Sequence, residues 1–305
     1  QSDLTQAEQL LPAKPLGTPS STATAELKYR TRLSSKPAVY ALMMDVYAWR
    51  HDYDMVIKMY EEKIEPLSKS ETGWGLEPNL TSTLAQNDFT TAYRTMFDKD
   101  KINPSDNLPM TREVFFTVYY HESENGTNQT RPYFNYGSQQ VDLTDDYVTS
   151  IAPGDKRLAA GFEDGGGGTN AKYRMYKYWV EKIDNSKPSD NFLPIYRYSD
   201  VVLLYAEALY MRDKFADAIN QMNRIRARSG VKPAVESDYV TDQTKLLDDI
   251  LHERRVELIG EGKYWFDLIR TGNTQRMANC TDNKIYFPIY RDHILQNPNL
   301  SLPPL

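Results

Sequence analysis

Cysteine and long apolar runs are scarce in this 305-residue chain, and each scarcity excludes a class of protein. The single cysteine, Cys280, cannot close an intrachain disulfide and cannot build a thiolate cluster for a metal ion. The most apolar run, residues 201–206, ends at Glu207, whereas a membrane-spanning helix needs roughly 18 residues. The sequence therefore predicts neither a disulfide-stapled fold nor a transmembrane helix.

Positive charge is also in short supply. Lysine and arginine number 36 against 42 aspartates and glutamates, so the net charge is −6. Nucleic acids and anionic membranes bind clustered positive charge, and this balance argues against both as main partners.

Tyrosine, by contrast, is abundant, with 22 residues against 10 phenylalanines. A tyrosine ring with a polar tip suits partly wet packing and binding surfaces.

Two helical hairpins recur at a distance of 162 residues. The first spans residues 36–66, and the second begins near residue 195. Four positions of the first (Met44, Tyr47, Tyr53, Val56) align with four of the second (Ala206, Leu209, Phe215, Ala218). The spacing resembles the tetratricopeptide repeat, in which small residues allow paired helices to approach closely. We therefore predict a mainly α fold of tetratricopeptide-like hairpins, an α/α superhelix.

The rest of the chain is assigned around these hairpins as one domain over residues 1–305. Residues 71–194 are rich in Gly, Asn and Pro and form a loop-rich insertion, with short strands expected at 114–120 and 173–180. Residues 195–272 hold the second hairpin and a long helix over 243–261, followed by a shorter helix to Arg270. Residues 273–305 are expected to form an extended tail.

Catalytic and cofactor signatures are missing. Residues 252–256 begin like a zinc-protease helix, but Val256 stands where the second histidine ligand is required. Asp98 and Asp100 begin like a calcium loop, but Pro109 stands where the bidentate glutamate belongs. Pairs of carboxylates such as Asp145-Asp146 are too common to rank. We predict no catalytic residue, no metal and no cofactor.

Arg254 lies on the apolar stripe of its predicted helix, four residues from both Ile250 and Leu258. Glu257 and Glu261 share that face, and Asp267 and Arg270 can extend the set of charges. One interpretation is an active site of paired carboxylates. We favour the other, a buried ionic cluster that joins neighbouring helices.

Several motifs together resemble the SusD/RagB family. They comprise residues 198–208 (YSDVVLLYAEA), 223–230 (NRIRARSG), 253–262 (ERRVELIGEG), 265–270 (WFDLIR), 287–289 and 297–300, with 154–157 and 177–179 upstream. The motifs follow the order in which the family carries them. The resemblance implies the C-terminal part of a non-enzymatic, outward-facing lipoprotein of the outer membrane, whose lipid anchor lies outside this chain. It also implies a SusC-like TonB-dependent transporter as partner and a glycan as ligand.

The ligand surface is expected in the insertion, because recognition by such a scaffold lies on its loops. Trp74 stands between two glycines, which predicts an exposed loop, and its alternatives are a ligand platform or a loop anchor. The other candidates are Arg131, Tyr133, Phe134 and Tyr136, grouped within six residues with Asn135. Aromatic faces stack on sugar rings. The other tryptophans (Trp49, Trp179, Trp265) are expected in the core.

Three further readings stay open. The chain can be a peptide-binding member of the same family, a carbohydrate-active enzyme, or a tetratricopeptide-type scaffold for a protein partner. Turnover of a polysaccharide separates the enzyme from the binding proteins. The chemical class of the ligand, glycan or peptide, separates the glycan-binding from the peptide-binding member of the family. A scaffold for a protein partner binds neither ligand.

Overall fold

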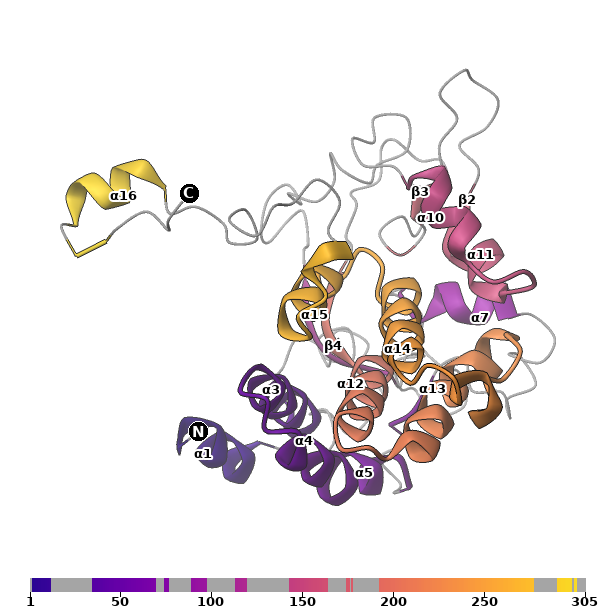
Figure 1. Cartoon of the computed structure of the whole chain (residues 1–305). Helices are drawn as coiled ribbons and strands as arrows, with labels where there is room; N and C mark the ends of the chain where they lie inside the picture. Colours follow the sequence, from indigo (N-terminus) through magenta and orange to yellow (C-terminus); the bar gives the residue numbers. More distant parts are fainter. Residues whose placement is uncertain are drawn as a thin grey trace, which may run out of the picture.

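The computed structural model describes residues 2–11, 35–69, 74–76, 89–97, 113–119, 143–163, 174–175, 177, 192–276, 290–297 and 299–300. Within them, helices form the scaffold and the strands are few and short (Figure 1). The helix α1 (Ser2–Leu10) packs on α3 (Lys36–Trp49). The Lys63 ammonium donates to Glu8 Oε1 at 2.6 Å and holds α1 in place. The mainly α fold predicted from the sequence is confirmed.

The first hairpin pairs α3 with α4 (Tyr53–Met59). The chain then passes through a π-helical turn (Tyr60–Ile64) into α5 (Glu65–Lys69). We expected this helix to end near Pro66, and it ends three residues later. Pro66 has no backbone N–H, so an α-helical bond to the Glu62 carbonyl cannot form, and the wider turn before it accommodates that loss.

The second hairpin pairs α12 (Tyr198–Tyr210) with α13 (Phe215–Ser229). The α13 helix ends at Gly230, whose φ of 74° is the left-handed conformation that glycine adopts without steric cost. Ala206 and Ala218, which we expected to be small so that the helices approach closely, are both fully buried. The α12 helix is buried on almost every side because α3, α4, α13 and α14 all pack against it.

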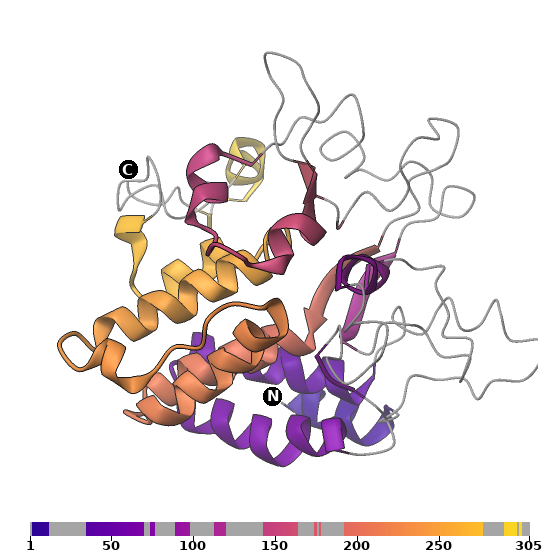
Figure 2. The same ribbon diagram turned by 90° about the vertical axis from the view of Figure 1, so that its right-hand side faces the viewer.

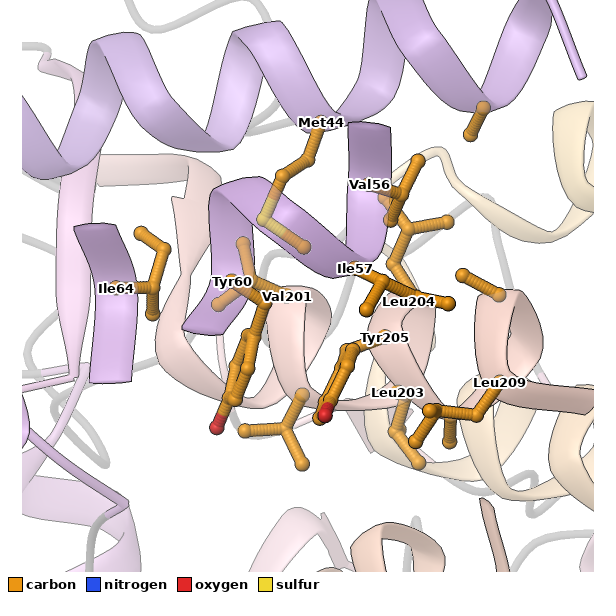
Figure 3. Close-up of a cluster of buried hydrophobic side chains, with 14 of the residues drawn as sticks. Met44, Val56, Ile57, Tyr60, Ile64, Val201, Leu203, Leu204, Tyr205 and Leu209 are labelled. Carbon is orange, nitrogen blue, oxygen red and sulfur yellow. The ribbon is translucent and has the colours of Figure 1, made fainter. Parts of the chain in front are cut away.

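The main core lies between the two hairpins (Figure 3). Met44 and Val56 of the first hairpin belong to the same buried cluster as Leu204 of the second. Tyr60 and Tyr205 stack with ring centroids 4.1 Å apart and an interplanar angle of 11°. Each hairpin alone exposes one apolar face, so stacking the pair is what removes that surface from water.

Two helices complete the scaffold after a short 3-10 turn (Glu236–Tyr239). The α14 helix (Thr244–Glu257) ends four residues before the predicted residue 261, and the chain then turns through Gly260 and Gly262 at positive φ. The α15 helix (Tyr264–Arg270) ends where predicted, next to a 3-10 turn (Thr274–Arg276). In the expected extended tail, residues 291–296 instead form the helix α16 (Arg291–Gln296).

The described parts of the insertion are short elements beside the scaffold (Figure 2). They are α7 (Phe89–Thr95), β1 (Val114–Tyr119), α10 (Asp145–Ser150), α11 (Lys156–Gly161), β2 (Phe162–Glu163) and β3 (Arg174–Met175). The strand β1 pairs antiparallel with β4 (Phe192–Arg197), and β2 pairs with β3. The predicted strand at 114–120 is confirmed. Of the one predicted at 173–180, only β3 is seen within the described residues.

Candidate functional site

Trp74 lies in the main core instead of an exposed loop. Its side chain is 5% exposed and meets Phe115 edge to face, with ring centroids 5.2 Å apart. Phe115 in turn meets Tyr198 of α12 at 6.1 Å. The expected exposed setting is wrong, because the indole packs into the main core against Phe115 of β1. The loop-anchor alternative describes this geometry.

The remaining sequence candidates, Arg131, Tyr133, Phe134 and Tyr136, lie outside the described residues. Trp179 lies outside them as well. The role of these four residues in ligand binding therefore stays a prediction.

Trp49, expected in the core, is 42% exposed at the end of α3 and contacts the exposed Phe266 edge to face at 6.3 Å. Trp265 is partly buried against Leu251 and Leu268. Helical position alone thus did not separate buried from exposed tryptophans.

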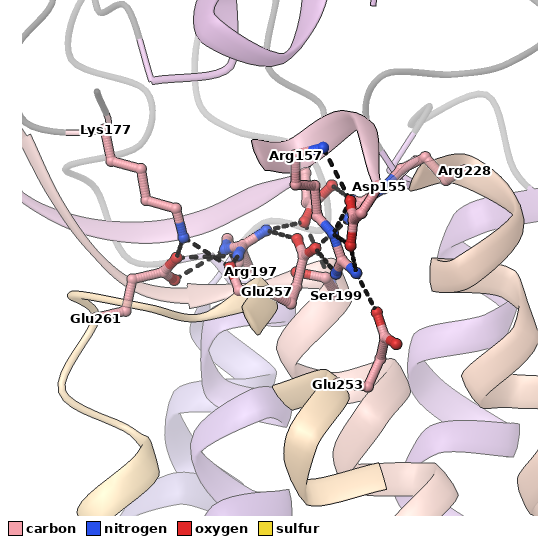
Figure 4. A network of polar contacts seen from close by, with 10 residues as sticks. Asp155, Arg157, Lys177, Arg197, Ser199, Arg228, Glu253, Glu257 and Glu261 are labelled. Carbon is pink, nitrogen blue, oxygen red and sulfur yellow. Dashed lines mark hydrogen bonds and ion pairs between the residues drawn. The ribbon is translucent and has the colours of Figure 1, made fainter. Parts of the chain in front are cut away.

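A buried set of charges joins the insertion to the scaffold (Figure 4). We call it the insertion network; its members are Glu113, Asp155, Arg157, Lys177, Arg197, Arg228, Glu253, Glu257 and Glu261. These charges come from positions spread over roughly half of the chain. Folding brings them together where the ends of β4, α13 and α14 meet α11.

Glu257 is the centre of the insertion network and is fully buried. Its Oε2 accepts from Arg157 Nη1 at 3.0 Å, its Oε1 accepts from Arg197 Nη1 at 2.6 Å, and Arg228 pairs with the same carboxylate. Its backbone carbonyl accepts from the Lys177 ammonium at 2.6 Å. Burial alone would raise the pKa of Glu257, but Arg228, Arg197 and Arg157 hold it well below its ordinary value.

The Lys177 ammonium is buried in the same network. Burial lowers its pKa from 10.5 to about 8, although the nearby Glu261 carboxylate acts in the opposite direction. It also donates to Glu261 Oε1 at 2.6 Å and lies 5.3 Å from the centre of the Phe97 ring. Arg197 holds the other side of Glu261 through Nε at 2.8 Å. Each charge in this region therefore has an opposite charge within contact.

A second buried set of charges lies wholly within the scaffold. We call it the scaffold network; its members are Asp200, Glu207, Arg254, Lys263, Asp267 and Arg270. Arg254 pairs with Asp200 at 2.9 Å and with Asp267 at 2.8 Å. Arg270 pairs with Glu207 at 2.6 Å and with Asp267 at 2.9 Å. These pairs join α12, α14 and α15.

The buried ionic cluster around Arg254 is present, but two of its expected partners were wrong. Arg254 pairs with neither Glu257 nor Glu261, whereas Asp267 and Arg270 do extend the set of charges, with Arg254 paired to Asp267. Glu261 no longer follows the helical register because α14 ends at Glu257, and the Glu257 carboxylate is paired with the arginines of the insertion network instead. The carboxylates of both networks are almost inaccessible to solvent, which suits cross-links between elements rather than contact with a substrate.

Most partners in the two networks were missed by sequence reasoning. Arg197, Arg228 and Glu113 lie in segments whose local pattern does not distinguish a buried charge from a surface one. A local signal exists at Asp155, which accepts from the backbone N–H of Arg157 at 2.9 Å as the cap of α11 and also pairs with its guanidinium. Across the described part of the chain, no group of three or more His, Cys, Asp or Glu side chains is placed to hold a metal ion.

The fold and the two networks define a class: a helical-repeat protein with a loop-rich insertion held to it by buried ion pairs. The sequence profile of the SusD family matches residues 113–286, more than half of the chain. The chain therefore belongs to the SusD family. No helix among the described residues is long and apolar enough to span a membrane.

Individual relatives agree with this assignment. The chain is 28% identical over 271 residues to SusD-like protein P38 of Formosa agariphila, covering 72% of this chain and 54% of that protein. A solved SusD superfamily protein of Bacteroides thetaiotaomicron is 19% identical with a TM-score of 0.71, covering 99% of this chain and 65% of that one. Surface glycan-binding protein A of the same species is also 19% identical, with a TM-score of 0.69 and coverage of 99% and 68%. The chain thus spans about half the length of the P38 relative.

Proposed function

We propose that this chain takes part in nutrient capture at the cell surface, binding oligosaccharides without hydrolysing them and passing them to a SusC-like TonB-dependent transporter. The observation that carries the proposal is the SusD family match over residues 113–286, which covers part of the insertion and both ionic networks. A structural neighbour named for surface glycan binding supports a glycan as the ligand. The outward-facing, lipid-anchored location at the outer membrane is proposed on the same family membership.

The proposed ligand surface is the insertion, with Arg131, Tyr133, Phe134 and Tyr136 as its contact residues. Three aromatic rings and a guanidinium close together in sequence offer flat faces to sugar C–H groups and donors to hydroxyls. Trp74, near the start of the insertion in sequence, packs its buried indole against Phe115. Its role in binding would therefore be support of the surface.

The test is affinity electrophoresis of the 305-residue chain through gels containing a panel of polysaccharides, with reducing ends assayed in parallel. Retardation by one polymer without release of reducing ends is expected. Tyr133→Ala should weaken that retardation, whereas Tyr290→Ala, which removes a tyrosine that is 65% exposed outside the insertion, should not. Release of reducing ends would contradict the non-catalytic role.

The peptide alternative has its own outcome in the same design. Fluorescence anisotropy with a library of labelled peptides would reveal binding that the polysaccharide panel lacks. Binding to peptides alone would change the proposed ligand from a glycan to a peptide, and the proposed role in nutrient capture would still hold. Binding to neither, together with a protein partner recovered as a stoichiometric complex, would replace the proposal with the scaffold reading.

A further inference from the structure

The two ionic networks connect different parts of the molecule. Every member of the scaffold network lies within residues 195–272. In the insertion network, by contrast, charges of the insertion pair with charges of the scaffold. Arg157 meets Glu253 at 2.6 Å, and Lys177 meets Glu261 at 2.6 Å. One network therefore holds the scaffold together, and the other holds the insertion on the scaffold.

Apolar side chains form separate clusters in the scaffold and in the later part of the insertion. We call residues 143–163, 174–175 and 177 the outer insertion. Its apolar side chains, among them Tyr147, Ile151 and Phe162, form a cluster separate from the main core. The scaffold adds Val256 and the partly buried Ile259 to this cluster. Ala160 packs instead in a cluster with α7. Among the described residues, only these two scaffold side chains join the Tyr147 cluster, so the buried charges are a large part of what fixes the outer insertion on the scaffold.

Glu257 lies at the centre of the insertion network and contacts both the outer insertion and the scaffold. The Glu257 carboxylate receives one arginine from the outer insertion and two from the scaffold, while its carbonyl receives Lys177. Removal of this side chain takes one partner from Arg157 on the outer insertion and one from each of two arginines on the scaffold. Within the described ranges, no member of the scaffold network pairs with a charge of the insertion.

We propose that Glu257 is a positioning residue for the insertion: it sets where the outer insertion sits on the helical scaffold, and ligand affinity depends on it although it touches no ligand. The dependence of affinity rests on the proposed function. The positioning itself does not, because it concerns the free protein.

The chain offers a matched pair of variants. Lys177→Met removes the ammonium beside Glu261, which keeps Arg197, and the methionine retains packing on the Phe97 ring. Lys263→Met removes the ammonium beside Asp200, which keeps Arg254, and the methionine retains packing on the Tyr196 ring at 4.1 Å. Each variant takes one lysine from a carboxylate that still has an arginine. They differ in the network to which the lysine belongs.

The measurement is amide hydrogen exchange of the full chain without ligand. In Lys177→Met, exchange within residues 145–161 should accelerate about tenfold or more, while residues 200–227 change by less than about twofold. Lys263→Met should not produce this selective loss in residues 145–161. Glu257→Gln should give a larger selective loss than Lys177→Met, and if it does not fold, Lys177→Met decides alone. Equal acceleration in both segments, or none in residues 145–161, would overturn the positioning role.

Affinity for the polysaccharide that retards the unmodified chain is measured on the same two lysine variants and on Glu257→Gln. Lys177→Met should bind at least about threefold more weakly than Lys263→Met, since a loosened insertion pays more ordering entropy on binding. Equal affinities of the two lysine variants, together with an unchanged affinity of Glu257→Gln, would overturn the dependence of binding on Glu257. A chain that binds nothing in the panel would count against the proposed function, and the exchange experiment would still decide the positioning role.

Discussion

His51 and Asp213 are separated by 162 residues and adopt the same left-handed backbone conformation, with φ values of 55° and 57°. Each lies in the turn of its hairpin. The residue after each donates its backbone N–H to an equivalent carbonyl, Asp52 to Tyr47 at 2.9 Å and Lys214 to Leu209 at 3.0 Å. The offset is the one that relates the two hairpins in sequence, so the repeat extends to backbone conformation and hydrogen bonding.

This turn predicts a specific response at Asp213. Left-handed φ brings Cβ close to the following carbonyl; aspartate tolerates it because its short polar side chain can hydrogen-bond locally, whereas a residue branched at Cβ rarely adopts it. Asp213→Val should lower the free energy of unfolding by about 1–2 kcal/mol. Asp213→Gly should leave it equal or higher, because glycine adopts this φ without steric cost. Urea unfolding followed by circular dichroism measures both, and equal stability of the valine and glycine variants would contradict the conformation.

The close approach of α12 and α13 predicts a second effect. Ala218 is fully buried between them, so a larger side chain has no space there. Ala218→Leu should destabilise the protein by about 1–3 kcal/mol. Ala216 lies on the same helix and is exposed, so Ala216→Leu is the control and should change stability little. Thermal unfolding of the two leucine variants side by side gives the comparison; a stable Ala218→Leu protein would contradict close packing.

The scaffold network predicts loss of stability in acid. Burial alone would raise the pKa of Asp200, but Lys263 and Arg254 outweigh it and hold the pKa at about 2, below the ordinary 3.8. As pH falls, the unfolded state therefore takes up the proton first. The contribution of the Asp200 charge is complete above pH 3.8 and disappears as pH falls through 2, and it amounts to about 2 kcal/mol. The stability difference between the unmodified chain and Asp200→Asn should thus narrow between about pH 4 and pH 2 in urea titrations. A stability difference that stays constant over this pH range would contradict the lowered pKa of Asp200.

Trp74 and Trp49 differ widely in exposure, so their replacement by alanine should lower the free energy of unfolding by different amounts. Trp74 is 5% exposed, and Trp74→Ala should lower the free energy of unfolding by about 3–5 kcal/mol. Trp49 is 42% exposed, so Trp49→Ala should cost clearly less. Chemical unfolding of both variants ranks them. If instead Trp74→Ala weakened only ligand binding and left stability intact, Trp74 would be part of the ligand surface rather than its support.

Much of the scaffold could be predicted because its information is local. Apolar residues at helical spacing identified both hairpins, and the glycine after Ser229 marks the end of α13. The helix around Pro66 was predicted less well, since its continuation depends on a π-helical turn that no simple periodicity describes. The exposure of Trp49 was missed for a related reason: which face of a helix is covered depends on neighbours distant in sequence.

The amino-acid sequence alone determined the repeat, the mainly helical class, the family and the presence of a buried arginine at position 254. Only the tertiary structure decided how the charges pair. Arg254 meets Asp200 rather than Glu257, and Glu257 meets Arg157 from a segment 100 residues earlier. Helix formation follows from spacing along one segment, whereas the stability of a buried ion pair depends on the distance between groups that only packing brings together.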